Sequence, residues 1–191
     1  MTRIAFIVGS LRQGSLSRKT AEALIRLIPE GMTGEIVEIG DLPLYNPDLD
    51  GDATPQAWTA FRDTMREVDG VVFVTPEYNR SVPASVKNAL DVGSRPYGQS
   101  VWAGKPAAIV SLSPGAIGGF GANHHLRQSL VFLDMPTLQQ PEAYIGGAGD
   151  LFDEAGEVKS DKTQAFLASI MSAFGALMAR YPIGRASCRE R

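Results

Sequence analysis

A segment near the start of the chain carries residue types that suit an anion. Residues 9–18 read Gly-Ser-Leu-Arg-Gln-Gly-Ser-Leu-Ser-Arg and directly follow the apolar run Ile4–Val8. Hydroxyl and guanidinium groups donate hydrogen bonds to phosphate oxygens, and the start of a following helix also favours negative charge. The spacing matches neither a Walker A loop nor a dinucleotide fingerprint. Its hydroxyl groups and guanidinium instead favour a terminal phosphate monoester. The candidate ligands are Ser10, Arg12, Ser15, Ser17 and Arg18.

On this loop alone an alternative stays open. Ser17 would then only cap a helix, and Arg12 would be a solvated loop charge.

A second segment suits a flat polar ring. Pro76-Glu77-Tyr78-Asn79 follows the apolar run Val71–Val74. Its backbone donors and acceptors can pair with the edge of a heterocycle, and Tyr78 can border the ring. A plain turn is the alternative, because proline and asparagine both favour turns.

A third, glycine-rich segment follows the apolar run Ala107–Leu112. Residues 113–121 read Ser-Pro-Gly-Ala-Ile-Gly-Gly-Phe-Gly, and glycine lets a ligand approach the backbone closely. Flexibility alone is the competing explanation. Ligands of open α/β sheets bind outside the carboxyl ends of the strands, so three such segments after three strands predict one shared site.

No acid–base or metal-binding constellation accompanies these loops. The two histidines, His124 and His125, are adjacent on a predicted helix and therefore diverge. The sequence shows no further cluster of metal-ligating residues and no Gly-x-Ser-x-Gly nucleophile elbow. We therefore expect no metal site and no catalytic side chain. This absence favours an organic cofactor that carries out the reaction itself.

The elements that position these loops alternate along the chain. Predicted strands are Ile4–Val8, Glu35–Ile39, Gly70–Thr75, Ala107–Leu112 and Thr137–Gln140. Predicted helices are Ser17–Leu27, Pro55–Val68, Pro83–Val92, Ala122–Leu133 and Lys162–Arg180. The alternation predicts a flavodoxin-like α/β three-layer sandwich with a five-stranded parallel sheet in the order 2-1-3-4-5. The long connection 40–54 is a loop that either borders the site or packs as a plain connector.

Composition limits the class of protein. The chain has 191 residues and a formal net charge of −3, which fits one domain and argues against a general nucleic-acid binder. Neither a signal peptide nor a membrane-spanning run is evident, and the single cysteine, Cys188, excludes an intrachain disulfide, so we expect a cytoplasmic protein. We interpret residues 1–183 as the domain and 184–191 as a non-native or disordered tail.

The combined motifs resemble the NADPH-dependent FMN reductase family, and more closely its bacterial chromate and quinone reductases. The resemblance rests on residues 9–17, on Pro76–Asn79 with Ser81-Val82-Pro83, and on Lys87-Asn88-Ala89. His125-Leu126-Arg127-Gln128 and Phe132-Leu133-Asp134 strengthen the closer match.

This resemblance implies bound FMN, NADPH or NADH as the hydride donor, and a homodimer or dimer of dimers. It implies that the first loop holds the FMN phosphate. The residues that it implies around the isoalloxazine ring are Pro76, Glu77, Tyr78, Asn79, Ser113 and Gly115. Tyr78 and Arg127 are candidates to polarise the electron acceptor, and Tyr78, Arg127 and Glu142 match residues that join subunits in close relatives.

The chain departs from the family pattern at two positions. Relatives often have Asp-Trp where this chain has Asp91-Val92, so a large aromatic contact in the subunit packing is lost. Position 80 is often neutral in relatives but is Arg80 here, beside the ring-binding loop. We hypothesise that Arg80 attracts anionic substrates or the 2′-phosphate of NADPH.

We therefore expect an NAD(P)H oxidoreductase that works by ping-pong hydride transfer through FMN. Its acceptors would be quinones, free flavin, chromate or azo compounds. The alternatives are a flavodoxin-type electron carrier without NAD(P)H activity and a flavin-free scaffold.

Overall fold

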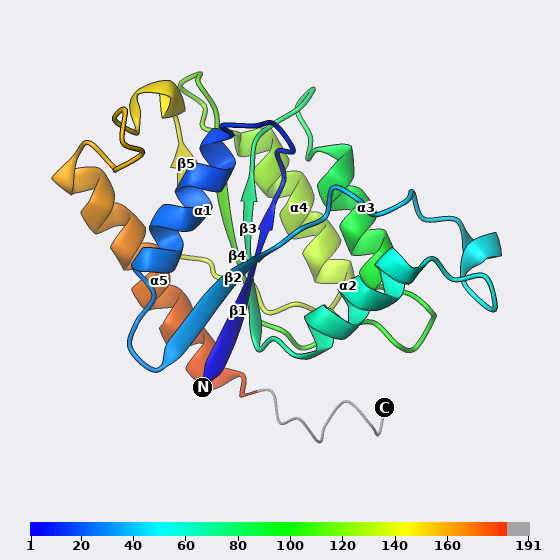
Figure 1. Cartoon of the computed structure of the whole chain (residues 1–191). Coiled ribbons are helices and arrows are strands. Elements are labelled where there is room, and N and C mark those ends of the chain that lie inside the picture. Colours follow the sequence, from blue (N-terminus) through cyan, green and yellow to red (C-terminus); the bar gives the residue numbers. More distant parts are fainter. Residues whose placement is uncertain (183–191) are drawn as a thin grey trace.

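Five parallel strands form the central layer of the protein. The computed structural model describes residues 1–182, and its sheet has the order β2-β1-β3-β4-β5, which confirms the predicted topology. The strands are β1 (Thr2–Val8), β2 (Met32–Val37), β3 (Gly70–Thr75), β4 (Ala107–Leu112) and β5 (Ala143–Ile145). Their carboxyl ends all lie at the top of Figure 1.

Helices cover both faces of this sheet, as the sequence predicts (Figure 1). Helices α1 (Leu16–Arg26) and α5 (Asp161–Arg180) cover one face, and α2 (Gln56–Arg66), α3 (Ala84–Gly93) and α4 (Phe120–Phe132) cover the other. Alternate side chains of β1 point to opposite layers: Phe6 joins the core with α1 and α5, whereas Ile7 joins the core with α2 to α4. Two short 3₁₀ turns, Pro47–Leu49 and Ala148–Asp150, lie in the connections.

Two predicted strands differ from the structure. The predicted strand at Thr137–Gln140 is wrong, because Thr137 makes only one isolated bridge to Ala107 and β5 forms at Ala143–Ile145 instead. Pro136 and Pro141 flank that segment and supply no N–H donor for a ladder. Strand β2 starts at Met32, three positions before the predicted start at Glu35, because its ladder with β1 begins at the Thr2–Met32 pair.

The interpretation of residues 184–191 as a tail lies outside the described residues. Within residues 1–182, no helix is both long and apolar enough to cross a membrane.

A buried ion pair fastens the long connection between β2 and α2. Nη1 and Nη2 of Arg62 donate to the two carboxylate oxygens of Asp50 at 2.8 and 2.9 Å, and Nε donates to the Val92 carbonyl at 2.9 Å. Both side chains of the pair are 5% exposed. Asn88 of α3 adds bonds to the Leu42 carbonyl and the Tyr45 N–H group. We call the connection 40–54 the strap, because these bonds tie it to α2 and α3.

We predict that Asp50→Ala lowers the free energy of unfolding by about 3–5 kcal/mol, because it leaves the Arg62 guanidinium buried without its partner. The control is Asp63→Ala, which breaks the exposed ion pair with Arg66 and is expected to cost less than about 1 kcal/mol. Urea denaturation monitored by circular dichroism measures the free energy of unfolding of both variants. Equal costs for the two variants would contradict the prediction.

Candidate functional site

The first two predicted loops meet where β1 and β3 end. The Gly9 N–H group donates to the Val74 carbonyl at 2.9 Å, and Ser85 Oγ donates to the Gly9 carbonyl at 2.9 Å. A Cβ atom at position 9 would lie 2.9 Å from Thr75 Oγ1 and 3.1 Å from Pro76 Cδ. Glycine is therefore required here. Its small size brings residues 9–18, which we call the anion loop, against the segment that starts at Pro76, which we call the ring loop.

The anion loop wraps around the N-terminus of α1. Ser15 is the N-cap, and its Oγ accepts a bond from the Arg18 N–H group at 3.3 Å. Gly14 has a φ of +65°, and a Cβ there would meet nothing within 4 Å, so the turn opens toward solvent. Ser17 follows in the first helical turn and is 2% exposed. The loop therefore combines hydroxyl groups with the free N–H groups of a helix start, which is an anion-binding arrangement.

The two arginines of this loop differ in their surroundings. Arg12 is exposed beside Ser10, which is half-buried. The guanidinium of Arg18 pairs with Glu38, directly after β2, and so points to the edge of the sheet. The structure thus groups Ser10, Arg12, Ser15 and Ser17 on one loop, while Arg18 contributes its backbone to the cap and its side chain to an ion pair.

The ring loop is a tight two-residue turn. Tyr78 and Ser81 exchange backbone hydrogen bonds at 2.9 and 3.0 Å. The central residues Asn79 and Arg80 have φ angles of +52° and +64°, as a type I′ turn demands. Tyr78 is 46% exposed, so its ring lies at the surface of the protein. The turn that the sequence analysis named as the alternative is present, and it leaves the Tyr78 side chain accessible.

Glu77 connects the ring loop to α4. Its Oε2 accepts a bond from the Ala122 N–H group at 3.1 Å, and its Oε1 accepts one from Arg80 Nη1 at 3.0 Å. The N-cap of α4, Gly119, has no side chain to cap the helix, so a carboxylate from another loop takes that role. Burial raises the pKa of Glu77, but the bonds from Ala122, Arg80 and Gly121 outweigh burial and leave its pKa lowered.

The third loop follows β4 and packs against the loop after β5. The Ala148 N–H group donates to the Ser113 carbonyl at 3.0 Å, and a Cβ at Gly118 would lie 2.5 Å from the carbonyl carbon of Tyr144. Ser113 Oγ donates to the Gly115 carbonyl at 3.0 Å. A Cβ at Gly115 would meet only Ser113 Oγ, at 3.8 Å, so the backbone there is open to a ligand.

Arg127 lies further along α4, with two of its nitrogens engaged. Its Nε donates to Asn123 Oδ1 at 3.0 Å, and its Nη1 donates to the Leu138 carbonyl at 3.1 Å. Nearby, the Tyr144 hydroxyl donates to Glu142 Oε1 at 3.0 Å. Burial raises the pKa of Tyr144, and the bond to Glu142 raises it further. Arg127 and Glu142 thus lie in one polar group, whereas Tyr78 belongs to the ring loop.

Sequence reasoning missed the role of Glu77 and the Asp50–Arg62 pair. A glycine N-cap on α4 is the signal that pointed to the capping role of Glu77, because such a helix needs a capping group from elsewhere.

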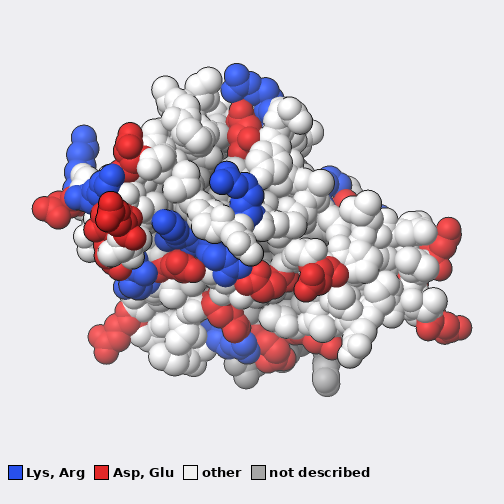
Figure 2. Space-filling model, turned by 45° about the horizontal axis from the view of Figure 1, so that its top comes forward, with Lys and Arg blue, Asp and Glu red and all other residues white. Residues whose placement is uncertain are grey.

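The charges of this edge of the sheet are shown in Figure 2, where Lys and Arg side chains form separate small groups rather than one continuous basic face. Within residues 1–182, no group of three or more His, Cys, Asp or Glu residues is placed to hold a metal ion.

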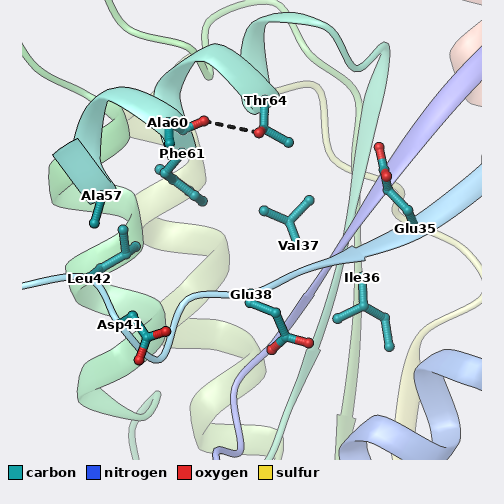
Figure 3. A pocket seen from close by; sticks show the side chains of 10 residues that line it. All are labelled: Glu35, Ile36, Val37, Glu38, Asp41, Leu42, Ala57, Ala60, Phe61 and Thr64. Atoms are coloured by element: carbon teal, nitrogen blue, oxygen red, sulfur yellow. Dashed lines mark hydrogen bonds between the residues drawn. The ribbon is translucent and has the colours of Figure 1, made fainter.

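A separate groove of about 320 Å³ lies between the edge strand β2 and α2 (Figure 3). Its walls include Phe61 and Leu42, with the carboxylates Glu35, Glu38 and Asp41. None of the residues predicted for the site lines this groove.

The chain matches a known family and known proteins over most of its length. Residues 2–150 match the model of a family described as NADPH-dependent FMN reductase. The chain is 61% identical over 171 residues to a quinone reductase of Pseudomonas putida, covering 90% of this chain and 91% of that protein. It is 45% identical over 174 residues to a 2-hydroxy-1,4-benzoquinone reductase of a Burkholderia species, covering 91% and 94%.

A solved structure is similar over nearly the whole length. The flavoenzyme NAD(P)H:(acceptor) oxidoreductase FerB from Paracoccus denitrificans superimposes with a TM-score of 0.89 at 38% identity, covering 95% of this chain and 99% of that chain.

We predict that Glu77→Gln destabilises the protein by about 1–2 kcal/mol at pH 7 and by less at acidic pH. A carboxylate with a lowered pKa in the folded state stabilises the fold above its unfolded value of about 4.5, and this stabilisation is lost as the pH falls toward the folded value. Urea denaturation from pH 7 to pH 3 measures the difference from the wild type. Glu35→Gln, in an exposed pair with Arg3, is the control. A cost of Glu77→Gln that does not change with pH contradicts the role of the negative charge.

Proposed function

Because the chain belongs to the NADPH-dependent FMN reductase family, we propose that it is an FMN-containing NAD(P)H oxidoreductase that reduces quinones. The acceptors that we propose beside quinones are free flavin, chromate and azo compounds. The observation that carries this function is the meeting of the anion loop and the ring loop at Gly9, at the same sheet edge where β4 ends and the loop with the open backbone of Gly115 follows. We also propose that the protein works in the cytoplasm.

The donor groups of the site fit FMN. A phosphate monoester needs several donors at one point, and the loop supplies hydroxyl groups, a guanidinium and the N–H groups of a helix start. Gly14 and Gly115 leave open space beside the backbone. We assign the phosphate to Ser10, Arg12, Ser15 and Ser17, with Arg18 near it through its backbone. We assign the edge and one face of the ring to Pro76, Glu77, Tyr78, Asn79, Ser113 and Gly115.

When bound, FMN supplies a centre that accepts hydride from a nicotinamide and passes electrons to an acceptor. The residues of this chain bind and orient the reactants. The rigid turn at Asn79 fixes the Tyr78 backbone, and Glu77 fixes the distance between that turn and α4. Donor and acceptor then use the same open side of the site in turn, which gives ping-pong kinetics, and positioning supplies much of the acceleration.

Tyr78 and Arg127 are the side chains that we propose to assist the acceptor. The Tyr78 hydroxyl can donate a bond to a quinone oxygen, and its exposure leaves it accessible. Arg127 is held by Asn123, by the Leu138 carbonyl and by a hydrogen bond with Tyr144, and its fixed positive charge can polarise an acceptor. No proton transfer by a side chain is required.

We further propose a homodimer or a dimer of dimers. The support is a groove of about 740 Å³ between α3 and α4, with Leu90, Val82 and Leu133 in its lining. Beside it α4 exposes two large apolar side chains, because Val131 is 76% and Phe132 is 85% exposed. Such a combination favours burial by a second protein surface. Val92, the position where relatives carry an aromatic residue, is fully buried in this chain and contributes to its own core.

We expect the purified protein to be yellow, and NADPH or NADH added under argon to bleach its flavin absorbance within seconds. A quinone added afterwards should restore the absorbance. Steady-state rates at several quinone concentrations should give parallel double-reciprocal lines, as in a ping-pong cycle. A yellow protein that neither donor bleaches would instead be a flavodoxin-type carrier, and a colourless protein that does not bind added FMN would be a flavin-free scaffold.

We predict that Arg12→Ala weakens FMN binding by about 1.5–3 kcal/mol, because a charge-assisted hydrogen bond to the phosphate is lost. Quenching of FMN fluorescence on titration with apoprotein measures the affinity. The control is Arg26→Ala at the far end of α1, where the guanidinium pairs with Glu157. The same affinity in Arg12→Ala and the wild type contradicts the assignment of this loop to the phosphate.

A further inference from the structure

Arg80 occupies a backbone conformation that arginine disfavours. It is the second central residue of the type I′ turn, with a φ of +64°, and glycine is the residue favoured there. A side chain in the left-handed region is less stable than glycine at the same position. The chain carries a long basic side chain at this position in spite of that strain, and residues in such strained conformations cluster at functional sites.

The guanidinium of Arg80 is oriented and still accessible. Its side chain is 74% exposed, while that of Glu77 is 10% exposed and is fixed by the N-terminus of α4. Nη1 donates to Glu77 Oε1 at 3.0 Å. The remaining nitrogens can form the paired bonds with which arginine recognises phosphate.

Arg18, Lys87 and Arg127, three other basic side chains around the three loops, are paired and less exposed than Arg80. Arg18 pairs with Glu38, and Lys87 donates to both carboxylate oxygens of Asp91 at 2.8 Å. Arg127 is held by Asn123 and by the Leu138 carbonyl. Arg12 lies on the loop that we assign to the cofactor phosphate. Arg80 is thus suited to a second phosphate, at the tip of the turn and not beneath the ring.

We propose that Arg80 is the residue that selects the hydride donor, by binding the 2′-phosphate of NADPH. This proposal rests on the proposed function. Arg80 directly follows Asn79 of the ring loop, and its side chain is 74% exposed, so its guanidinium lies at the rim of the site that we assign to the ring. A dinucleotide whose nicotinamide stacks on that ring must cross this rim. NADPH and NADH differ only in the 2′-phosphate, so this contact favours NADPH.

The test compares kcat/KM for NADPH and NADH in Arg80→Gly, Arg80→Lys and the wild type, with a quinone as acceptor. Arg80→Gly keeps the turn, because glycine favours this conformation, and should lower the NADPH/NADH ratio by about tenfold or more. Arg80→Lys keeps the charge and should retain most of the preference. The control is Arg66→Ala on α2, which removes a similar exposed pair with Asp63 and should leave both constants unchanged.

A binding measurement tests the same contact without turnover. Calorimetry with adenosine 2′,5′-bisphosphate should show weaker binding to Arg80→Gly than to the wild type, whereas adenosine 5′-monophosphate should show no difference. If both donors lose kcat/KM equally, Arg80 holds the shared pyrophosphate or the turn itself, and the proposal is wrong. An unchanged ratio in an active enzyme also overturns it. A wild type that is inactive with both donors would instead overturn the proposed function.

Discussion

Parallel pairing of all five strands is the constraint on which the remaining structure depends. Because the strands point the same way, their carboxyl ends meet at one edge, and the loops after β1, β3 and β4 lie there together. The meeting is close because Gly9 has no side chain to separate its loop from Thr75 and Pro76. Two segments that begin 67 positions apart, at Gly9 and at Pro76 (76 − 9 = 67), thereby become two walls of the candidate site. The place where these loops meet therefore follows from the topology of the sheet, and the side chains at that place decide what can bind there.

One carboxylate then makes these loops a single unit. Glu77 lies on the loop after β3 but caps α4, which follows β4, and it also holds Arg80. Glu77 therefore links the Tyr78 turn directly to the first turn of α4. The helix start provides N–H groups and the positive end of its dipole, so the negative charge of Glu77 is compensated from both sides. The turn is thus held by Glu77, while the backbone at Gly14 and Gly115 faces open space.

The sequence predicted the features that repeat along the chain. Apolar runs such as Gly70–Thr75 and Ala107–Leu112 matched β3 and β4 because strands buried on both faces are continuously apolar. β5 was predicted wrongly because its three residues are too few to show a pattern, and the flanking segment at Thr137 looks equally extended. The turn at Asn79 follows a local rule, whereas the N-cap of α1 is Ser15 and not Ser17, which the sequence analysis considered. The Glu77–Ala122 bond and the Asp50–Arg62 pair join distant residues, and no local pattern encodes such pairs.

The strap is held at Tyr45 and Asp50, which we call its base, and is exposed at residues 51–53. Asp50 and Tyr45 are held by Arg62 and Asn88, whereas Leu44 is 76% exposed and the residues after Asp50 face solvent. Length changes at residues 51–53 therefore leave the bonds of the base intact. The protein can accept an inserted peptide, a label or a tether at this point without disturbing the sheet edge where the loops meet. The buried pair thus separates a part of the molecule that evolution or an engineer can vary from the part that must stay fixed.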